Sequence, residues 1–170
     1  LAQYFAVGLM SSGMPATIYG FFIGYLNVPA YVYATAGVIT SIPWSFKFLF
    51  GMINDCFPIF GRRRKPYMCI GWAFCCVMLV LLSMQTRPEP YWCRDEVGEF
   101  ITSVTSADGK KTAAEPCNEE ASRQGGHFAF FMMLASLGYV VADVAADGLT
   151  VEYARREPTS KRGRTQTTAY

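Results

Sequence analysis

Three ionisable side chains lie inside stretches of sequence that are otherwise strongly apolar. Lys47 belongs to one stretch, and Asp143 and Asp147 belong to another, where a four-residue spacing places both carboxylates on one face of a helix. If these stretches cross a bilayer, each charge costs at least about 2.5–3.5 kcal/mol, so it faces the protein interior or a wet cavity and usually has a partner. Two interpretations stay open: a Lys47–Asp143 pair that only locks two helices together, or groups that line a solute path or carry protons.

The composition around these charges is that of a membrane protein. Of the 170 residues, 52% are hydrophobic and 16% are charged, whereas soluble domains average about 25% charged residues. Residues 1–46 contain no Asp, Glu, Lys, Arg or His. Because a helix needs roughly 20 apolar residues to cross a bilayer, this segment predicts two spans.

Four apolar blocks, each close to the length that a bilayer demands, predict four transmembrane helices. Backbone polar groups without partners cost several kcal/mol in lipid, so blocks of this length must be helical. The expected fold is therefore an all-α membrane protein. The predicted helices cover residues 4–26, 31–53, 67–84 and 127–149, joined by an outer loop 85–126 and inner loops 54–66 and 150–170.

The distribution of basic residues predicts the orientation. Basic residues concentrate in loop 54–66 and in the tail 150–170, whereas loop 85–126 carries five basic and eight acidic residues. Because short basic loops stay in the cytoplasm, the amino terminus and loop 54–66 are expected inside and loop 85–126 outside. The basic residues concerned are Arg62, Arg63, Arg64, Lys65, Arg155, Arg156, Lys161, Arg162 and Arg164.

Small residues recur every fourth position in two of the predicted helices, and prolines interrupt two of them. Small residues on one face let helix backbones approach closely in lipid, so tight bundle packing is expected, with a sliding surface as the functional alternative. Pro15 and Pro43 are expected to kink their helices. The small residues are Gly8, Ser12, Ala16, Gly20 and Gly24 in the first helix, and Gly138, Ala142 and Ala146 in the fourth.

Two of the six cysteines, Cys93 and Cys117, lie in the predicted outer loop and are the candidates for a disulfide. The other four are expected to be free. The Cys and His spacing suggests no metal site, and neither a nucleophile–base pair nor a phosphate-binding loop is evident. We therefore expect no enzyme activity, no cofactor and no nucleic-acid partner.

Three segments, in the same order, resemble the folate–biopterin transporter family of the major facilitator superfamily. The first reads Ser41-Ile42-Pro43-Trp44 with Lys47, and it continues through Gly51, Asp55, Pro58, Gly61, Arg63, Arg64 and Pro66-Tyr67. The second runs from Asp143 through Asp147 and Glu152 to Arg155. The third is Arg162-Gly163-Arg164-Thr165-Gln166.

The resemblance implies a bundle of about twelve helices in two halves, of which residues 1–170 would form part of the amino-terminal half. It implies transport of folate, pterins or related solutes, with the remaining helices of the full-length protein as partners. We expect alternating access as the mechanism, ion coupling because an ionisable pair lies within the membrane, and membrane lipid as a further partner. Lys47 could attract a folate carboxylate, and Asp143 or Asp147 could accept pterin N–H donors.

The resemblance also implies a gating loop at the inner surface. Asp55 and Arg63 would form its latch, with Asp55 facing a helix terminus or an arginine of a neighbouring helix, for which Arg155 is the candidate. The alternative for residues 62–65 is that they only fix the topology and meet anionic lipid headgroups, and for Arg62 this alternative is favoured. The other members of the expected gate are Gly51, Gly61, Arg64 and Glu152.

The competing class is a four-helix membrane scaffold of the tetraspanin type, which also has a large outer loop between its third and fourth helices. Such a loop should contain a Cys-Cys-Gly element. Here the adjacent pair Cys75-Cys76 lies inside the third predicted helix. The charges at Lys47, Asp143 and Asp147 favour a transporter over a scaffold.

Overall fold

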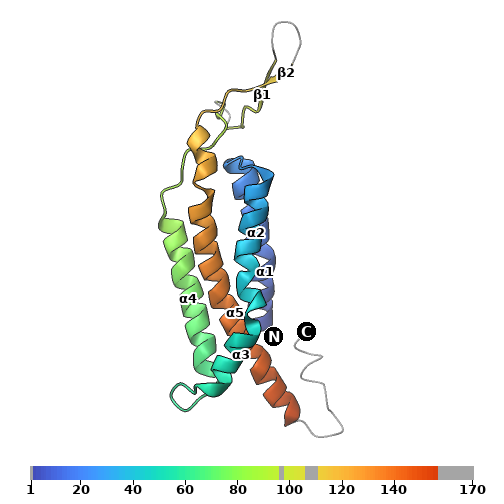
Figure 1. The fold of residues 1–170 in the computed structure, drawn as a ribbon, viewed down its shortest axis with the longest axis vertical. Helices are drawn as coiled ribbons and strands as arrows, with labels where there is room; N and C mark the ends of the chain where they lie inside the picture. The colour runs from blue at the N-terminus through green and yellow to red at the C-terminus, as the bar shows by residue number, and fades with distance from the viewer. Residues whose placement is uncertain (1, 96–97, 106–110, 157–170) are drawn as a thin grey trace.

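The computed structural model describes residues 2–95, 98–105 and 111–156 of the chain. It is dominated by helices, with one short hairpin of strands near one end (Figure 1). In chain order the elements are α1 (Ala2–Tyr19), the π-helix η1 (Gly20–Tyr25), α2 (Ala30–Ser45), α3 (Lys47–Cys56), α4 (Lys65–Met84), β1 (Ser103–Thr105), β2 (Lys111–Ala113), the 3₁₀-helix η2 (Glu119–Arg123) and α5 (Gly125–Arg155).

Four helical segments of the described chain are long and apolar enough to cross a membrane, which confirms the predicted number of spans. They are Ala2–Tyr25, Ala30–Cys56, Lys65–Met84 and Glu119–Arg155. The boundaries differ at the carboxyl end of the fourth span, where α5 continues to Arg155. Glu152 and Arg155 therefore lie on the last turns of a helix and not in a loop beginning at residue 150.

The second span is interrupted at Phe46, between α2 and α3. Phe46 has φ −97° and ψ 11°, and its amide donates to the Pro43 carbonyl at 3.2 Å. Pro43 lies three residues before the interruption, so the predicted kink is displaced from the proline. Pro15 lies within the unbroken helix α1, which turns into the π-helix η1 only at Gly20.

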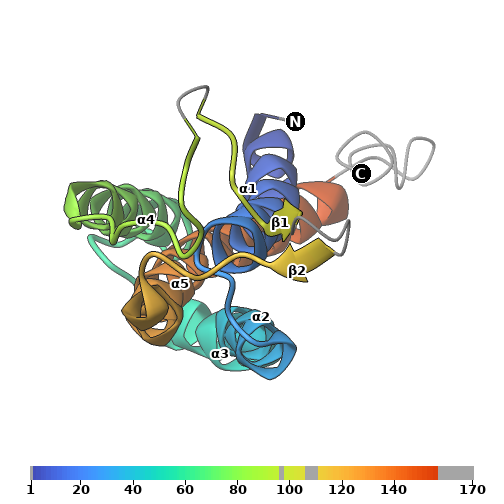
Figure 2. The same ribbon diagram turned by 90° about the horizontal axis from the view of Figure 1, so that it is seen from above.

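Helix α5 is the central element of the bundle. Viewed from above it lies between α4 on one side and α1, α2 and α3 on the other (Figure 2), and it contacts all four. Buried residues occur along α5 from Gly125 to Ala146, and Val140 and Ala142 have no solvent-exposed surface. The loop 57–64 and the end of α5 lie at the end of the bundle opposite β1 and β2 (Figure 1).

The closest helix contact is between α4 and α5, where Gly71 faces Gly138. A Cβ atom at Gly138 would lie 2.7 Å from the Cys75 amide nitrogen and 2.8 Å from the Gly71 carbonyl oxygen. The predicted small-residue face of the fourth helix thus makes a tight backbone contact. The corresponding face of α1 does not, because a Cβ atom at Gly8, Gly20 or Gly24 would meet no other atom within 4 Å, and Ser12 and Ala16 are exposed.

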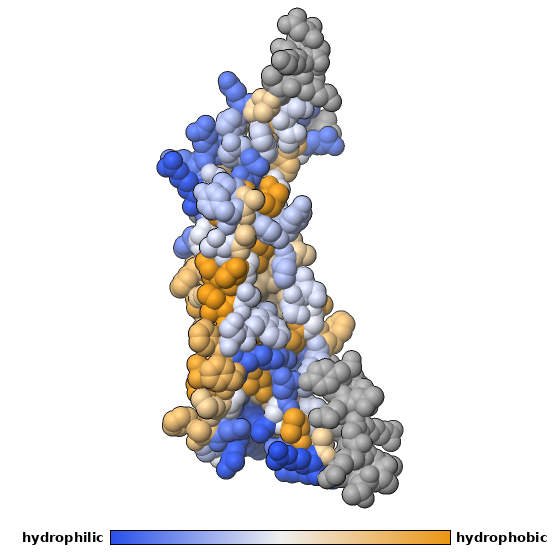
Figure 3. Space-filling view, turned by 45° about the vertical axis from the view of Figure 1, so that its right-hand side comes forward, coloured by the Kyte–Doolittle hydropathy of each residue, from blue (hydrophilic) through white to orange (hydrophobic). Residues whose placement is uncertain are grey.

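The segment between α4 and α5 is held to the end of the bundle by local bonds. Cys93 and Cys117 form a disulfide, with their Cα atoms 5.3 Å apart. The Tyr25 hydroxyl donates to the Pro88 carbonyl at 2.9 Å, and the Tyr91 amide donates to the Tyr25 carbonyl at 3.1 Å. Strands β1 and β2 pair antiparallel. Polar residues gather at both ends of the molecule and apolar ones between them (Figure 3).

Replacing Gly138 with Ala should destabilise the protein, because the added methyl would meet backbone atoms that cannot move independently. Overpacking of this kind costs about 1–3 kcal/mol. Thermal unfolding of the purified full-length protein measures the effect. Gly126→Ala is the matched control, since a Cβ at this position on the same helix has no atom within 4 Å. Equal melting temperatures for the two variants would contradict the close contact.

Candidate functional site

The centre of the site is an ion pair between the second and fourth spans. Lys47 Nζ lies 2.6 Å from Asp143 Oδ2 and 3.4 Å from Asp147 Oδ2. The Asp143 side chain is only 7% exposed, whereas the Lys47 side chain is 30% exposed. Lys47 is the first residue of α3, immediately after the interruption at Phe46. The spacing of Asp143 and Asp147 on α5 lets one ammonium group reach both carboxylates.

Further polar and aromatic groups surround this pair. The Tyr4 hydroxyl on α1 donates to Asp147 Oδ1 at 3.0 Å and lies 2.9 Å from the Thr150 hydroxyl. Lys47 Nζ lies 4.6 Å from the centre of the Trp44 ring, within the range of a cation–π contact. Helices from three spans therefore meet at one polar cluster within the apolar band.

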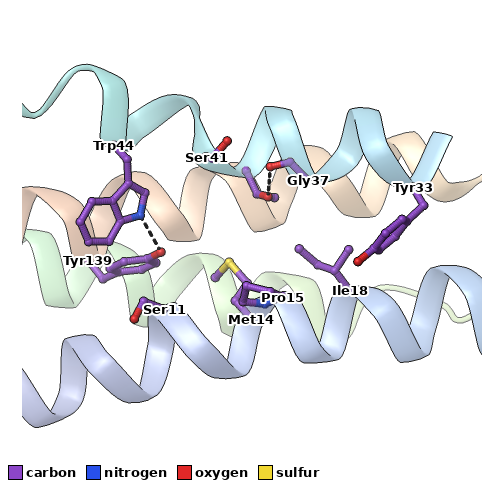
Figure 4. A pocket seen from close by; sticks show the side chains of 10 residues that line it. Ser11, Met14, Pro15, Ile18, Tyr33, Gly37, Ser41, Trp44 and Tyr139 are labelled. Atoms are coloured by element: carbon purple, nitrogen blue, oxygen red, sulfur yellow. Dashed lines mark hydrogen bonds between the residues drawn. The ribbon is translucent and has the colours of Figure 1, made fainter. Parts of the chain in front are cut away.

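A cavity of about 180 Å³ lies between α1, α2 and α5 and is bounded at one end by Trp44 and Tyr139 (Figure 4). Trp44 Nε1 donates to the Tyr139 hydroxyl at 3.1 Å. Since Trp44 contacts both the cavity and Lys47, the cavity adjoins the ion pair. Its lining combines aromatic rings and hydroxyl groups: Ser11, Met14, Pro15, Ile18, Tyr33, Gly37, Thr40, Ser41, Trp44 and Tyr139.

This arrangement can bind a flat polar molecule. Aromatic faces stack on flat rings, and hydroxyl groups both donate and accept hydrogen bonds. Typical ligand pockets measure about 300–1,000 Å³, so the cavity would hold part of a ligand of that size. Within the described residues no group of three or more His, Cys, Asp or Glu side chains could hold a metal ion.

In the expected gating loop, Asp55 pairs with an arginine other than the ones predicted. Arg64 Nη2 lies 3.2 Å from Asp55 Oδ1, so the partner of Asp55 is Arg64 and not Arg155 or Arg63. The loop turns back at Phe60 and Gly61, whose φ values are 50° and 70°, while Ile59 and Arg62 exchange backbone hydrogen bonds of 3.2 and 3.0 Å. Because Gly61 adopts positive φ without steric cost, the turn returns the chain to the end of α3.

Gly148 on α5 provides the space for this ion pair. A Cβ atom at Gly148 would collide with the Arg64 guanidinium, which lies across the helix at that point. Gly51 is less crowded, because the nearest atom to a Cβ there is Val144 Cγ1 at 3.7 Å.

Three other members of the expected gate face a common hollow. Arg63, Glu152 and Arg155 line a cavity of about 440 Å³ together with Asp55, Arg64 and Val151. Glu152 Oε1 is 2.6 Å from Arg156 Nη2, and Arg156 is the residue that follows the last residue of α5. Lys161, Arg162, Gly163, Arg164 and Gln166, from the basic tail and the third resembling segment, lie outside the described residues.

Sequence reasoning did not identify Tyr4, Tyr139, Thr150 or Gly148 as parts of the site. Trp44 was recognised only as part of a motif. Tyr4 and Tyr139 are tyrosines within apolar helices, where their hydroxyl groups need partners, and this was the available signal. The role of Gly148 depends on where Arg64 lies, which only the fold determines.

The fold and the site define a multi-pass integral membrane protein with a partly buried ion pair beside a cavity between its helices. The model of the BT1 family matches residues 8–90. "Probable folate-biopterin transporter 4" of Arabidopsis thaliana is 26% identical over 132 residues, which is 78% of this chain and 20% of that protein. The chain is therefore similar in sequence to folate–biopterin transporters of the BT1 family.

Two further relatives have transporter names. "Folate transporter 1" of Plasmodium falciparum is 44% identical over 46 residues, or 27% of this chain and 9% of that protein. "Probable folate-biopterin transporter 2" of Arabidopsis thaliana is 38% identical over 53 residues, or 31% of this chain and 11% of that protein. The chain thus corresponds to a fifth or less of the length of these relatives. No solved structure matched it.

The ion pair can be tested by a double-mutant cycle. Lys47→Met or Asp143→Leu alone should lower the free energy of unfolding by about 1–3 kcal/mol, less than the roughly 3–5 kcal/mol for breaking a fully buried pair. The double variant should recover much of this loss, because neither member of the pair is left without the other, and Asp147 keeps its hydrogen bond from Tyr4. Thermal unfolding of the full-length protein measures all four forms. Additive losses would show that the two side chains do not interact.

Proposed function

We propose that the full-length protein carries folate, pterins or related small solutes across a membrane by alternating access. The observation that supports this most is the Lys47–Asp143 pair beside the cavity. A charge within the membrane is expensive and usually belongs to a transport pathway. The names of the relatives supply the solute class.

The chemistry of the site suits such a solute. Folate carries carboxylates, which the Lys47 ammonium would attract, and a pterin ring has adjacent N–H donors, which Asp143 or Asp147 would accept. Trp44 and Tyr139, held together by their hydrogen bond, would provide flat surfaces for the ring. Binding would require Lys47 to exchange a carboxylate of the protein for one of the solute.

That exchange also suggests how transport could be coupled to an ion. When Lys47 leaves Asp143, the buried carboxylate needs another positive charge, which a proton or a metal cation from solution would supply. The burial of the pair therefore supports ion coupling, which we include in the proposal.

The gate would lie at the end of the bundle that contains loop 57–64. The basic residues Arg62, Arg63, Arg64 and Lys65 favour a cytoplasmic position for this end, and the disulfide favours an extracytoplasmic position for the opposite end. The Asp55–Arg64 pair would hold α3 and the start of α4 against α5 at Gly148. Opening would separate Asp55 from Arg64, with Arg63 and Arg155 as the alternative partners across the same hollow.

The remaining helices of the full-length protein would cover the surfaces that this segment exposes. The small-residue face of α1 and η1, from Gly8 to Gly24, is exposed among the described residues. Small residues suit a close helix contact, and we propose that helices outside this segment provide it.

Removing the indole N–H of Trp44 should weaken solute binding. Trp44→Phe deletes the hydrogen bond that orients Tyr139 at the cavity, and a hydrogen bond contributes about 1 kcal/mol, or roughly a fivefold increase in KM. The measurement is the initial rate of uptake of labelled folate at a series of concentrations, in cells that produce the full-length protein. An unchanged KM would exclude Trp44 from the solute site.

Trp72→Phe is the matched control. Its indole N–H donates to Gln3 Oε1 at 2.8 Å, and it does not line the cavity. The same chemical change at this position should leave KM unchanged. Equal effects of the two variants would point to a general loss of packing and not to solute binding.

A further inference from the structure

A second hollow, of about 340 Å³, lies at the end of the bundle opposite β1 and β2, between the 57–64 loop, the start of α4 and the end of α5. Its lining is partly apolar, and Glu152 is the one acidic residue in that lining. The other charged residues of the lining are all positive. The lining residues are Arg62, Arg63, Arg64, Lys65, Leu149, Glu152, Tyr153 and Arg156.

The positive charge of this hollow is only partly balanced by the protein. Arg64 is paired with Asp55, and Arg156 is paired with Glu152. For Arg62, Arg63 and Lys65, no ion pair is found among the described residues. Three cations around one hollow thus lack an oppositely charged partner in that part of the chain. Guanidinium groups bind phosphate oxygens through paired hydrogen bonds, and the amino terminus of α4 at Lys65 adds a favourable dipole.

Exposed aromatic side chains stand next to these cations. Phe60 is 96% exposed at the tip of the turn, Phe57 is 67% exposed, and Tyr153 is 47% exposed. The Phe60 backbone has φ 50°, a region that large residues seldom adopt. Exposing a phenylalanine ring to water is unfavourable, whereas aromatic residues are enriched at membrane–water interfaces. The adjacent helices cross the bilayer, so the turn lies at its surface.

From these observations we infer that the hollow binds the phosphate-bearing headgroup of an anionic phospholipid. Arg62, Arg63 and Lys65 contact the headgroup, and Phe60 enters the interface beside it. The aromatic residues favour a lipid over a soluble phosphate compound, since a soluble anion would make no use of them. The inference does not depend on the transported solute, because Arg62, Lys65 and Phe60 lie outside the cavity and the Lys47–Asp143 pair.

Native mass spectrometry of the purified full-length protein tests this inference with phosphatidylserine as the probe and phosphatidylcholine as the neutral lipid. The wild-type protein should bind phosphatidylserine more tightly. Arg62→Ala/Lys65→Ala should weaken that binding by about fivefold for each cation removed. Arg87→Ala/Arg123→Ala is the matched control, because it removes two exposed cations from the opposite end of the bundle and should leave the binding unchanged.

Two further measurements separate a lipid from a soluble anion. Phe60→Asn suits the positive φ and leaves the charge unchanged, and it should weaken lipid binding. Glycerophosphoserine and inorganic phosphate, which have no acyl chains, should bind far more weakly than phosphatidylserine. The inference is overturned if phosphatidylserine binds no tighter than phosphatidylcholine, if the two double variants lose equal affinity, or if the soluble anions bind as tightly as the lipid.

Discussion

A bilayer offers no water to an unpaired charge, and the ion pair of Lys47 with Asp143 meets that constraint at the centre of this fold. The ammonium and carboxylate oxygen lie 2.6 Å apart, with the aspartate side chain 7% exposed. The interruption at Phe46 starts a new helix at Lys47. Trp44 and Tyr4 complete the surroundings, so three spans converge on one pair of charges.

Helix α5 connects this pair to both ends of the molecule. Gly138 brings it against α4, Tyr139 bounds the cavity, and Gly148 makes room for Arg64 at the proposed gate. These positions lie on one helix, so a displacement of α5 would change the cavity, the ion pair and the gate together. This is the physical basis on which the proposed alternating access rests.

Hydropathy and charge alone predicted the four spans, because the bilayer fixes the length of a crossing helix. The rarity of charges in apolar helices also suggested that Lys47 and Asp143 pair, and the structure places them 2.6 Å apart. The interruption at Phe46 was missed. Pro43 predicted a kink in this span, but the helix breaks three residues further on, at a position that the proline alone does not determine. The predicted partner of Asp55 was wrong. The turn at Gly61 determines which arginine returns to the end of α3, and this arginine is Arg64. The close contact predicted for the small-residue face of α1 is not made within this segment, and we propose that helices outside it provide that contact.

The measurement that tests the account most directly is folate and pterin uptake by the Lys47→Met/Asp143→Leu variant of the full-length protein, at matched surface expression. This variant separates the two roles of the pair, because apolar side chains replace both charges, while Asp147 keeps its hydrogen bond from Tyr4. The account predicts that the protein reaches the membrane and melts near the wild-type temperature but transports neither solute. Uptake at the wild-type rate would contradict it, and would leave the pair as a structural contact between two helices.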